Sequence, residues 1–110
     1  MLKYDFSKIK KDAQEFEFRG GKLNIRMYPA NKESFIMSDK GVLYEGEKQK
    51  QKFIYVLVSW DAKDNEGKSI KCSDENKAII FDNNIDPELV NFSIAKADEI
   101  RAEQVQIEKN

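Results

Sequence analysis

The longest unbroken apolar run in the chain covers residues 53–58 and predicts its central element. Four side chains in and just after this run have the i, i+3, i+4, i+7 spacing of one helical face: Phe53, Val56, Leu57 and Trp60. Residues 47–52 are good helix formers without a glycine or proline among them. The pattern therefore predicts a helix from Glu47 to Trp60.

A buried strand is the alternative for the same run, because several of its side chains favour strands: Ile54, Tyr55, Val56 and Val58. Ile54 and Val58 lie outside the main helical stripe, so a helix here would be apolar on most of its circumference. Such a helix is either central in the core or covered by a partner.

Alternation of polar and apolar residues on either side of two glycines predicts a β-hairpin over residues 14–28. Gly20 and Gly21 form the expected two-residue loop. Pairing Arg19 with Lys22 gives a register in which both faces are chemically consistent. In this register Phe18 lies opposite Leu23, Phe16 opposite Ile25, Glu17 opposite Asn24 and Glu15 opposite Arg26.

The connection from the hairpin to the central helix is less regular. Pro29 is expected to end the second strand, residues 30–37 to form a short helix and residues 38–41 a turn. Residues 42–44 are expected to add a third strand. Because a two-stranded hairpin is only marginally stable in water, this strand or a packed helix is needed to support it.

Two further helices are expected after the central element. Residues 61–68 contain the turn formers that end the central helix. Ser73 is then expected to cap a short helix from Asp74 to Asp82, whose acidic first turn suits the positive end of a helix. Residues 83–84 break this helix.

The last helix is expected to begin at Pro87, with Asp86 as its cap, and to reach Gln104. Its apolar stripe consists of Leu89, Phe92, Ala95 or Lys96, and Ile100, broadened by Val90, Ile94 and Ala97. The apolar content then thins, which indicates either a frayed tail or a small docking strip for a partner.

Together these elements predict an α+β fold: an N-terminal antiparallel β-hairpin or small three-stranded sheet followed by a bundle of about three helices. The 110 residues fit a single domain. It divides into a hairpin-containing part at 1–46, a helical part at 47–104 and a frayed tail at 105–110.

Charge and composition narrow the classes of function. The net charge is −1 and 35% of the residues are charged, so no broad basic field exists to bind nucleic acid. Lys48, Lys50 and Lys52 form a local cluster. It is expected to be a solvated helix face, with an anion-binding role as the alternative.

The sequence shows no catalytic constellation. It has no histidine, which removes the commonest general base and metal ligand, and one cysteine, which cannot form an internal disulfide. Cys72 is expected to be a buried or half-buried thiol, because no histidine is present to activate it. A non-enzymatic protein without a cofactor is therefore predicted.

The acidic loop at residues 61–68 raises the question of calcium. If Gly67 matched the invariant glycine of an EF-hand loop, Ala62 and Ser73 would occupy positions that require carboxylate ligands. No metal site is therefore predicted. The N-terminal residues lack the features of a signal peptide, and no apolar run approaches the roughly 18 residues of a membrane span. A cytoplasmic protein without a membrane partner is expected.

The second half of the chain resembles the tail assembly chaperones of long-tailed bacteriophages. That family has an N-terminal β segment, a helix ending in tryptophan, an Asp/Asn-rich glycine turn, a helix opening with Ser or Thr, and a final helix. The matching segments here are Leu57-Val58-Ser59-Trp60-Asp61, Asp64-Asn65-Glu66-Gly67-Lys68, Ser73-Asp74-Glu75-Asn76-Lys77-Ala78-Ile79-Ile80, and Leu89 through Ala97. The hairpin half matches the family only in kind.

The resemblance implies a non-enzymatic role in which the protein binds the apolar helical tape measure protein during tail assembly and helps to recruit tail-tube subunits. Self-association is a further expectation. Phe53, Leu57 and Trp60 are expected to lie in a binding groove or in the core. The predicted partner-contact residues are Phe53, Leu57, Trp60, Asp61, Asp64 and Glu66.

Two other functions remain open at this point. The first is a phage-encoded inhibitor of a host defence enzyme, which would act through an acidic surface. The residues expected to form that surface are Asp61, Asp64, Glu66, Asp74 and Glu75. The second is a structural head–tail or tail component of the virion.

Overall fold

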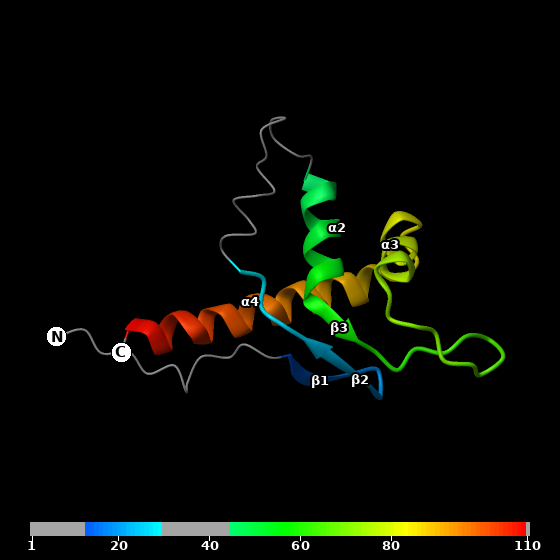
Figure 1. The fold of residues 1–110 in the computed structure, drawn as a ribbon, viewed down its shortest axis with the longest axis horizontal. Coiled ribbons are helices and arrows are strands. Elements are labelled where there is room, and N and C mark those ends of the chain that lie inside the picture. The colour runs from blue at the N-terminus through cyan, green and yellow to red at the C-terminus, as the bar shows by residue number, and fades with distance from the viewer. Residues whose placement is uncertain (1–12, 30–44, 110) are drawn as a thin grey trace.

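A three-stranded antiparallel sheet and three helices form the α+β fold (Figure 1). The computed structural model describes residues 13–29 and 45–109. The short helix expected at 30–37, the turn at 38–41 and the strand at 42–44 lie outside the described residues. The α+β class and the order of a hairpin followed by helices are confirmed.

The hairpin forms in a different register from the predicted one. Strands β1 (Gln14–Phe18) and β2 (Gly21–Ile25) pair so that Phe16 lies opposite Leu23. The turn is Arg19-Gly20, and both residues have the positive φ of a type I′ turn, 51° and 79°. Side chains alternate between the two faces of a strand, so a shift of two residues leaves each one on the same face. The apolar side chains therefore still share one face.

Gly21 explains why the turn moves by one position along the chain. The carboxylate of Asp61 packs on this glycine, and a Cβ built there would lie 2.5 Å from Asp61 Oδ1. The neighbouring Lys22 N–H donates to Asp61 Oδ2 at 3.0 Å. The second glycine is therefore used for a close approach within the strand.

The central run is a helix that changes directly into a strand. Helix α2 covers Glu45–Val56, and strand β3 (Leu57–Ser59) follows at the next residue. Leu57 pairs with Ile25 on β2. The predicted helix is therefore correct to Val56 and wrong from there to Trp60, because the sheet takes its third strand from this segment.

Helices α3 (Asp74–Asp82) and α4 (Pro87–Lys109) begin at the predicted caps. The Asn76 N–H donates to Ser73 Oγ at 3.1 Å, and the Leu89 N–H donates to Asp86 Oδ1 at 3.1 Å. Helix α4 extends beyond Gln104, its expected end.

A Schellman motif ends α3. Asn84 has a positive φ of 50°, and its N–H donates to the Phe81 carbonyl at 3.1 Å. The Ile85 N–H donates to the Ile80 carbonyl at 3.0 Å. The predicted break at 83–84 is therefore confirmed, with asparagine in the position that glycine usually fills.

Helix α2 packs against both α3 and α4, while α4 covers one face of the sheet (Figure 1). The buried apolar side chains are Leu23, Ile25, Tyr28, Phe53, Val56, Leu57, Leu89, Ala97 and Ile100. The predicted stripe on α4 is corrected at two positions: Ala95 is exposed, whereas Ser93 is fully buried and donates to the Leu89 carbonyl at 2.8 Å.

The lysines of α2 help to hold this arrangement. Lys50 Nζ lies 3.0 Å from an Asp82 carboxylate oxygen on α3, and Lys52 Nζ lies 2.9 Å from Asp98 on α4. Both lysines are half-buried. The expected solvated face is therefore wrong for these two residues, because each reaches across to a neighbouring helix.

Candidate functional site

The carboxyl end of α2 is unusual because no loop follows it. The last carbonyls of a helix have no partner within the helix and carry its negative dipole end. Here Arg26 meets two of them: its backbone N–H donates to the Val56 carbonyl at 2.9 Å, and its Nε–H donates to the Tyr55 carbonyl at 2.8 Å. An extension of β2 thus caps the helix.

Lys77 caps the other side of the same helix end. Its Nζ donates to the Ile54 carbonyl at 2.6 Å and to the Leu57 carbonyl at 2.8 Å. The residue is only 4% exposed, and the Asp74 carboxylate lies 3.5 Å from the ammonium. The buried charge is therefore satisfied by two carbonyls and one carboxylate.

Aromatic side chains stand beside the capped helix end. The Arg26 guanidinium lies 3.8 Å from the centre of the Tyr55 ring, in cation–π geometry. The rings of Tyr55 and Tyr28 are 5.5 Å apart and nearly perpendicular. These contacts fix the wall formed by the end of β2.

A hollow of about 450 Å³ opens between this wall, the end of α2 and the start of α3. Its apolar lining includes Ile54, Tyr55 and Val58, and Val58 is 41% exposed. Helix α2 is packed by α3 and α4 on its other sides. We call this hollow the α2-end hollow.

Cys72 also lines the α2-end hollow. Its thiol lies 3.9 Å from the Leu57 carbonyl oxygen and is half-buried, as predicted. Burial raises the pKa of the Cys72 thiol, and the nearby Lys77 ammonium offsets only part of that effect. A raised pKa keeps the thiol protonated at neutral pH and lowers its nucleophilicity.

The predicted apolar contact residues lie mainly in the core. Phe53 and Leu57 are fully buried, so the core is where the structure places these two side chains. Trp60 is half-buried, and its Nε1–H donates to the Ile70 carbonyl at 2.7 Å. Of the three, only Leu57 lines the hollow.

The predicted acidic contact residues support local backbone structure. Asp61 binds the Lys22 N–H, as described above. Asp64 Oδ1 accepts from the Glu66 N–H at 2.8 Å and from the Lys68 N–H at 3.0 Å, which closes the turn at Gly67. The Glu66 carboxylate lies 3.6 Å from Lys68 Nζ in an exposed pair.

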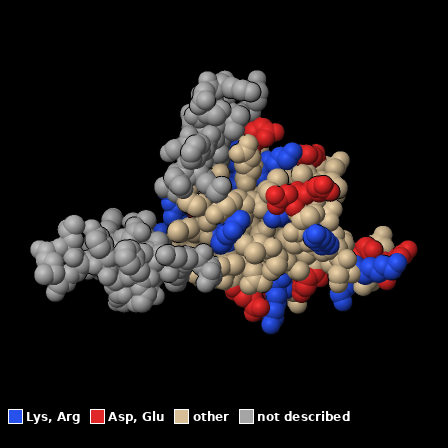
Figure 2. Space-filling view, in the orientation of Figure 1, with Lys and Arg blue, Asp and Glu red and all other residues tan. Residues whose placement is uncertain are grey.

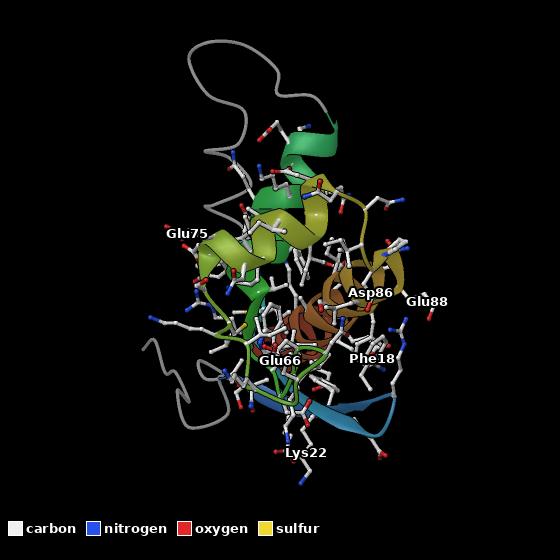
Figure 3. The ribbon with its side chains drawn as sticks, turned by 90° about the vertical axis from the view of Figure 1, so that its right-hand side faces the viewer. Phe18, Lys22, Glu66, Glu75, Asp86 and Glu88 are labelled. Carbon is white, nitrogen blue, oxygen red and sulfur yellow. The ribbon has the colours of Figure 1, made fainter. Side chains whose placement is uncertain are left out.

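Two of the acidic side chains expected to share one surface, Glu66 and Glu75, lie apart. Figure 3 places Glu75 and Glu66 well apart, on α3 and on the loop before it. On the face drawn in Figure 2, lysine and arginine side chains alternate with aspartate and glutamate. This surface therefore carries mixed charge.

Arg26, Tyr28, Tyr55 and Lys77 are site residues that the sequence analysis missed. The sequence indicates this site only through Ile54 and Val58, the two apolar positions outside the main helical stripe. Lys77 gave no such signal, since its sequence neighbourhood resembles that of any lysine on a solvated helix.

Comparison with protein-family models, curated proteins and solved structures found no match for this chain. Among the described helices, none combines the length and the apolar character needed to cross a membrane. Within residues 13–29 and 45–109, no three potential metal-ligating side chains lie close enough together to hold an ion.

Proposed function

We propose that this protein acts by contact rather than by catalysis, and that the α2-end hollow binds apolar side chains of a helical segment in another protein. One observation carries the proposal. The side of α2 and β3 that bears Ile54, Tyr55 and Val58 is left open where α3 and α4 pack elsewhere on the helix. Protein-binding sites are built from mixed apolar and polar surface of this kind.

The dimensions and chemistry of the hollow suit a few anchor side chains. A volume of about 450 Å³ lies in the range of specific binding pockets. Its lining combines these apolar side chains with polar ones: Arg26, Gln51, Asp74 and Lys77. Protein interfaces likewise combine apolar contact residues with polar ones.

A helical partner fits this geometry because its anchors recur at i, i+3 and i+4 on one face. The resemblance to tail assembly chaperones makes the tape measure protein of a long-tailed bacteriophage the proposed partner. In this proposal the contact residues differ from those expected from sequence: Ile54, Tyr55 and Val58 replace Phe53, Leu57 and Trp60.

The test replaces Val58 by aspartate and measures binding to a fragment of a tape measure protein by titration calorimetry. Aspartate places a charge in the lining of the hollow, so we expect the Kd to rise at least tenfold. Ile79→Asp is the matched control, because Ile79 is 51% exposed on α3 and does not line the hollow. We expect this control to bind like the unaltered protein.

Equal losses for Val58→Asp and Ile79→Asp would contradict the location of the site. Failure of the unaltered protein to bind any tape measure fragment would contradict the choice of partner. A general leucine-based amphipathic peptide, measured in parallel, separates these two results: it tests the hollow without assuming a bacteriophage partner.

A further inference from the structure

The two edges of the three-stranded sheet differ in character. At β3 the Leu57 carbonyl accepts from Lys77 Nζ at 2.8 Å, so one backbone group beside this edge is bound to α3. At the other edge β1 pairs with β2 and with no other described strand. Across residues 13–29 and 45–109, the β1 edge therefore has no neighbouring strand, and we call it the open edge.

The backbone groups at the open edge follow from the hairpin register. The two-residue turn is flanked by Phe18 and Gly21, and such a hairpin closes on a hydrogen-bonded pair. Hydrogen-bonded and non-hydrogen-bonded pairs alternate along antiparallel strands. Glu15 and Glu17 therefore direct their N–H and C=O groups away from β2, where an added strand could bind them.

The same two residues make the solvent face of this edge acidic. The side chains of Glu15 and Glu17 are exposed. Glu15 lies 3.6 Å from Lys22 Nζ in an exposed pair, which contributes little energy. Lys22 points away from the helices in Figure 3, which marks this face of the hairpin as the solvent side.

The opposite face of the open edge is aromatic. The ring centres of Phe18 and Phe92 lie 4.8 Å apart, and those of Phe16 and Phe92 lie 6.5 Å apart. Phe16 and Phe18 are half-buried; the Lys96 ammonium lies 5.7 Å from the centre of the Phe16 ring, and the Arg19 guanidinium lies 4.6 Å from the centre of the Phe18 ring. An added strand would meet acidic side chains on one face and aromatic side chains on the other.

A second copy of β1 is a poor occupant. In an antiparallel β1–β1 pairing, the glutamates of one copy face the glutamates of the other, because strand alternation keeps all four on the solvent face. Like charges directly opposite each other are destabilising. A strand with lysine or arginine at every second position instead places a cation beside each glutamate.

We propose that the open edge of β1 binds an extended basic segment of a partner protein as a fourth, antiparallel strand, with lysine or arginine beside Glu15 and Glu17 and apolar residues beside Phe16 and Phe18. This mode of recognition combines backbone hydrogen bonds with alternate side-chain contacts. It is independent of the α2-end hollow.

The test measures how tightly capped synthetic peptides of about seven residues bind to the full-length chain by β-strand addition. A peptide alternating lysine and valine is expected to bind at least tenfold more tightly than one alternating glutamate and valine. Glu15→Lys together with Glu17→Lys should reverse this preference. Glu47→Lys together with Glu75→Lys changes the net charge equally at other exposed positions and should preserve it.

Backbone pairing is tested separately from charge. Only alternate amides of an added strand face β1. Glu15 and Glu17 would form hydrogen-bonded pairs with the lysines opposite them, so the lysine amides face β1. We therefore expect a lysine–valine peptide N-methylated at every valine to bind, and one N-methylated at every lysine to lose at least tenfold in affinity. Equal affinity of these two peptides, or of the lysine and glutamate peptides, would overturn the proposal.

Discussion

Within residues 13–29 and 45–109, two residues other than glycine adopt the left-handed backbone conformation, and they do so in different ways. Asn84, at φ 50°, belongs to the residue type that tolerates this region best. Arg19, at φ 51°, has no such advantage, but its guanidinium binds Asp86 at 2.8 and 3.0 Å and Glu88 at 2.8 Å. The hydrogen bond to Glu88, and after it those to Asp86, raise the pKa of Arg19 above its usual value.

The buried ammonium of Lys77 provides the clearest prediction at the residue scale. Lys77→Met keeps most of the side-chain volume but removes both donors to the carbonyls at the end of α2. We expect the free energy of unfolding to fall by about 2–3 kcal/mol, because buried carbonyls lose a charge-assisted partner. Urea unfolding with an unchanged m-value would measure this effect.

Lys71→Met is the control for this substitution, because Lys71 is exposed on the segment just before α3. Its effect should stay within about 0.5 kcal/mol. If the two variants were equally stable, the Lys77 contacts would not matter to the helix end.

At the scale of elements, the direct passage from α2 to β3 couples the helix to the sheet. Val56 is the last residue of the helix, and Leu57 already pairs with Ile25. Because no loop residue lies between them, the helix determines which side chains of β3 face the core.

Inserting one glycine between Val56 and Leu57 would expose this coupling. The insertion rotates β3 by one position, so Leu57 would face solvent and Val58 the core. We expect a loss of about 3 kcal/mol or more, since a fully buried leucine contributes about 1.5–3 kcal/mol and the helix caps are also disturbed. Chemical denaturation would measure the loss.

A glycine inserted after Gly67 serves as the comparison, because this position lies at an exposed turn. The cost there should be below about 1 kcal/mol. If both insertions were tolerated equally, the helix and strand would not share a fixed phase.

The sequence predicted those elements whose signals are local. Ser73, Asp86 and Pro87 mark helix starts through groups within three or four residues, so both starts were correct. The hairpin register was wrong by two residues, because Asp61, far away in the chain, packs against Gly21. The sequence indicated a strand at residues 57–59 only as an alternative to the helix, because the pairing partner of β3 is remote in sequence.

The candidate site was predicted less well than the fold. Apolar periodicity put Phe53 and Leu57 on a different face from Ile54 and Val58. It could not tell which of the two faces is fully buried in the core and which is left partly open. That choice depends on where α3 and α4 pack. Lys77 was unpredictable from local sequence, because its partners are carbonyl oxygens 20 or more positions away.

At the scale of the whole molecule, the last helix supports the first strands. Phe92 of α4 packs on Phe16 and Phe18 of β1, and Asp86 and Glu88 bind Arg19 in the hairpin turn. Leu89, Ala97 and Ile100 on α4 also belong to the core. Without α4, the apolar face of the sheet would lose the helix that covers it.

A chain ending at Asn84 tests this dependence. It retains every strand, but we expect it to lack cooperative unfolding, because the apolar face of the sheet is uncovered. Near-ultraviolet circular dichroism would report the loss of a fixed environment around Trp60. A chain ending at Glu103 keeps Leu89, Ser93, Ala97 and Ile100, which are buried on the part of α4 whose side chains the structure describes, and should unfold cooperatively. A sharp transition in the shorter chain would contradict this account.

The contact between β1 and α4 also has a consequence for synthesis on the ribosome. The hairpin leaves the exit tunnel before α4, the helix that covers it, because α4 follows it in the chain. During that interval the phenylalanines of β1 are exposed in the nascent polypeptide, and the charges of Glu15 and Glu17 beside them oppose aggregation. The contact between β1 and α4 therefore forms only after α4 has been translated.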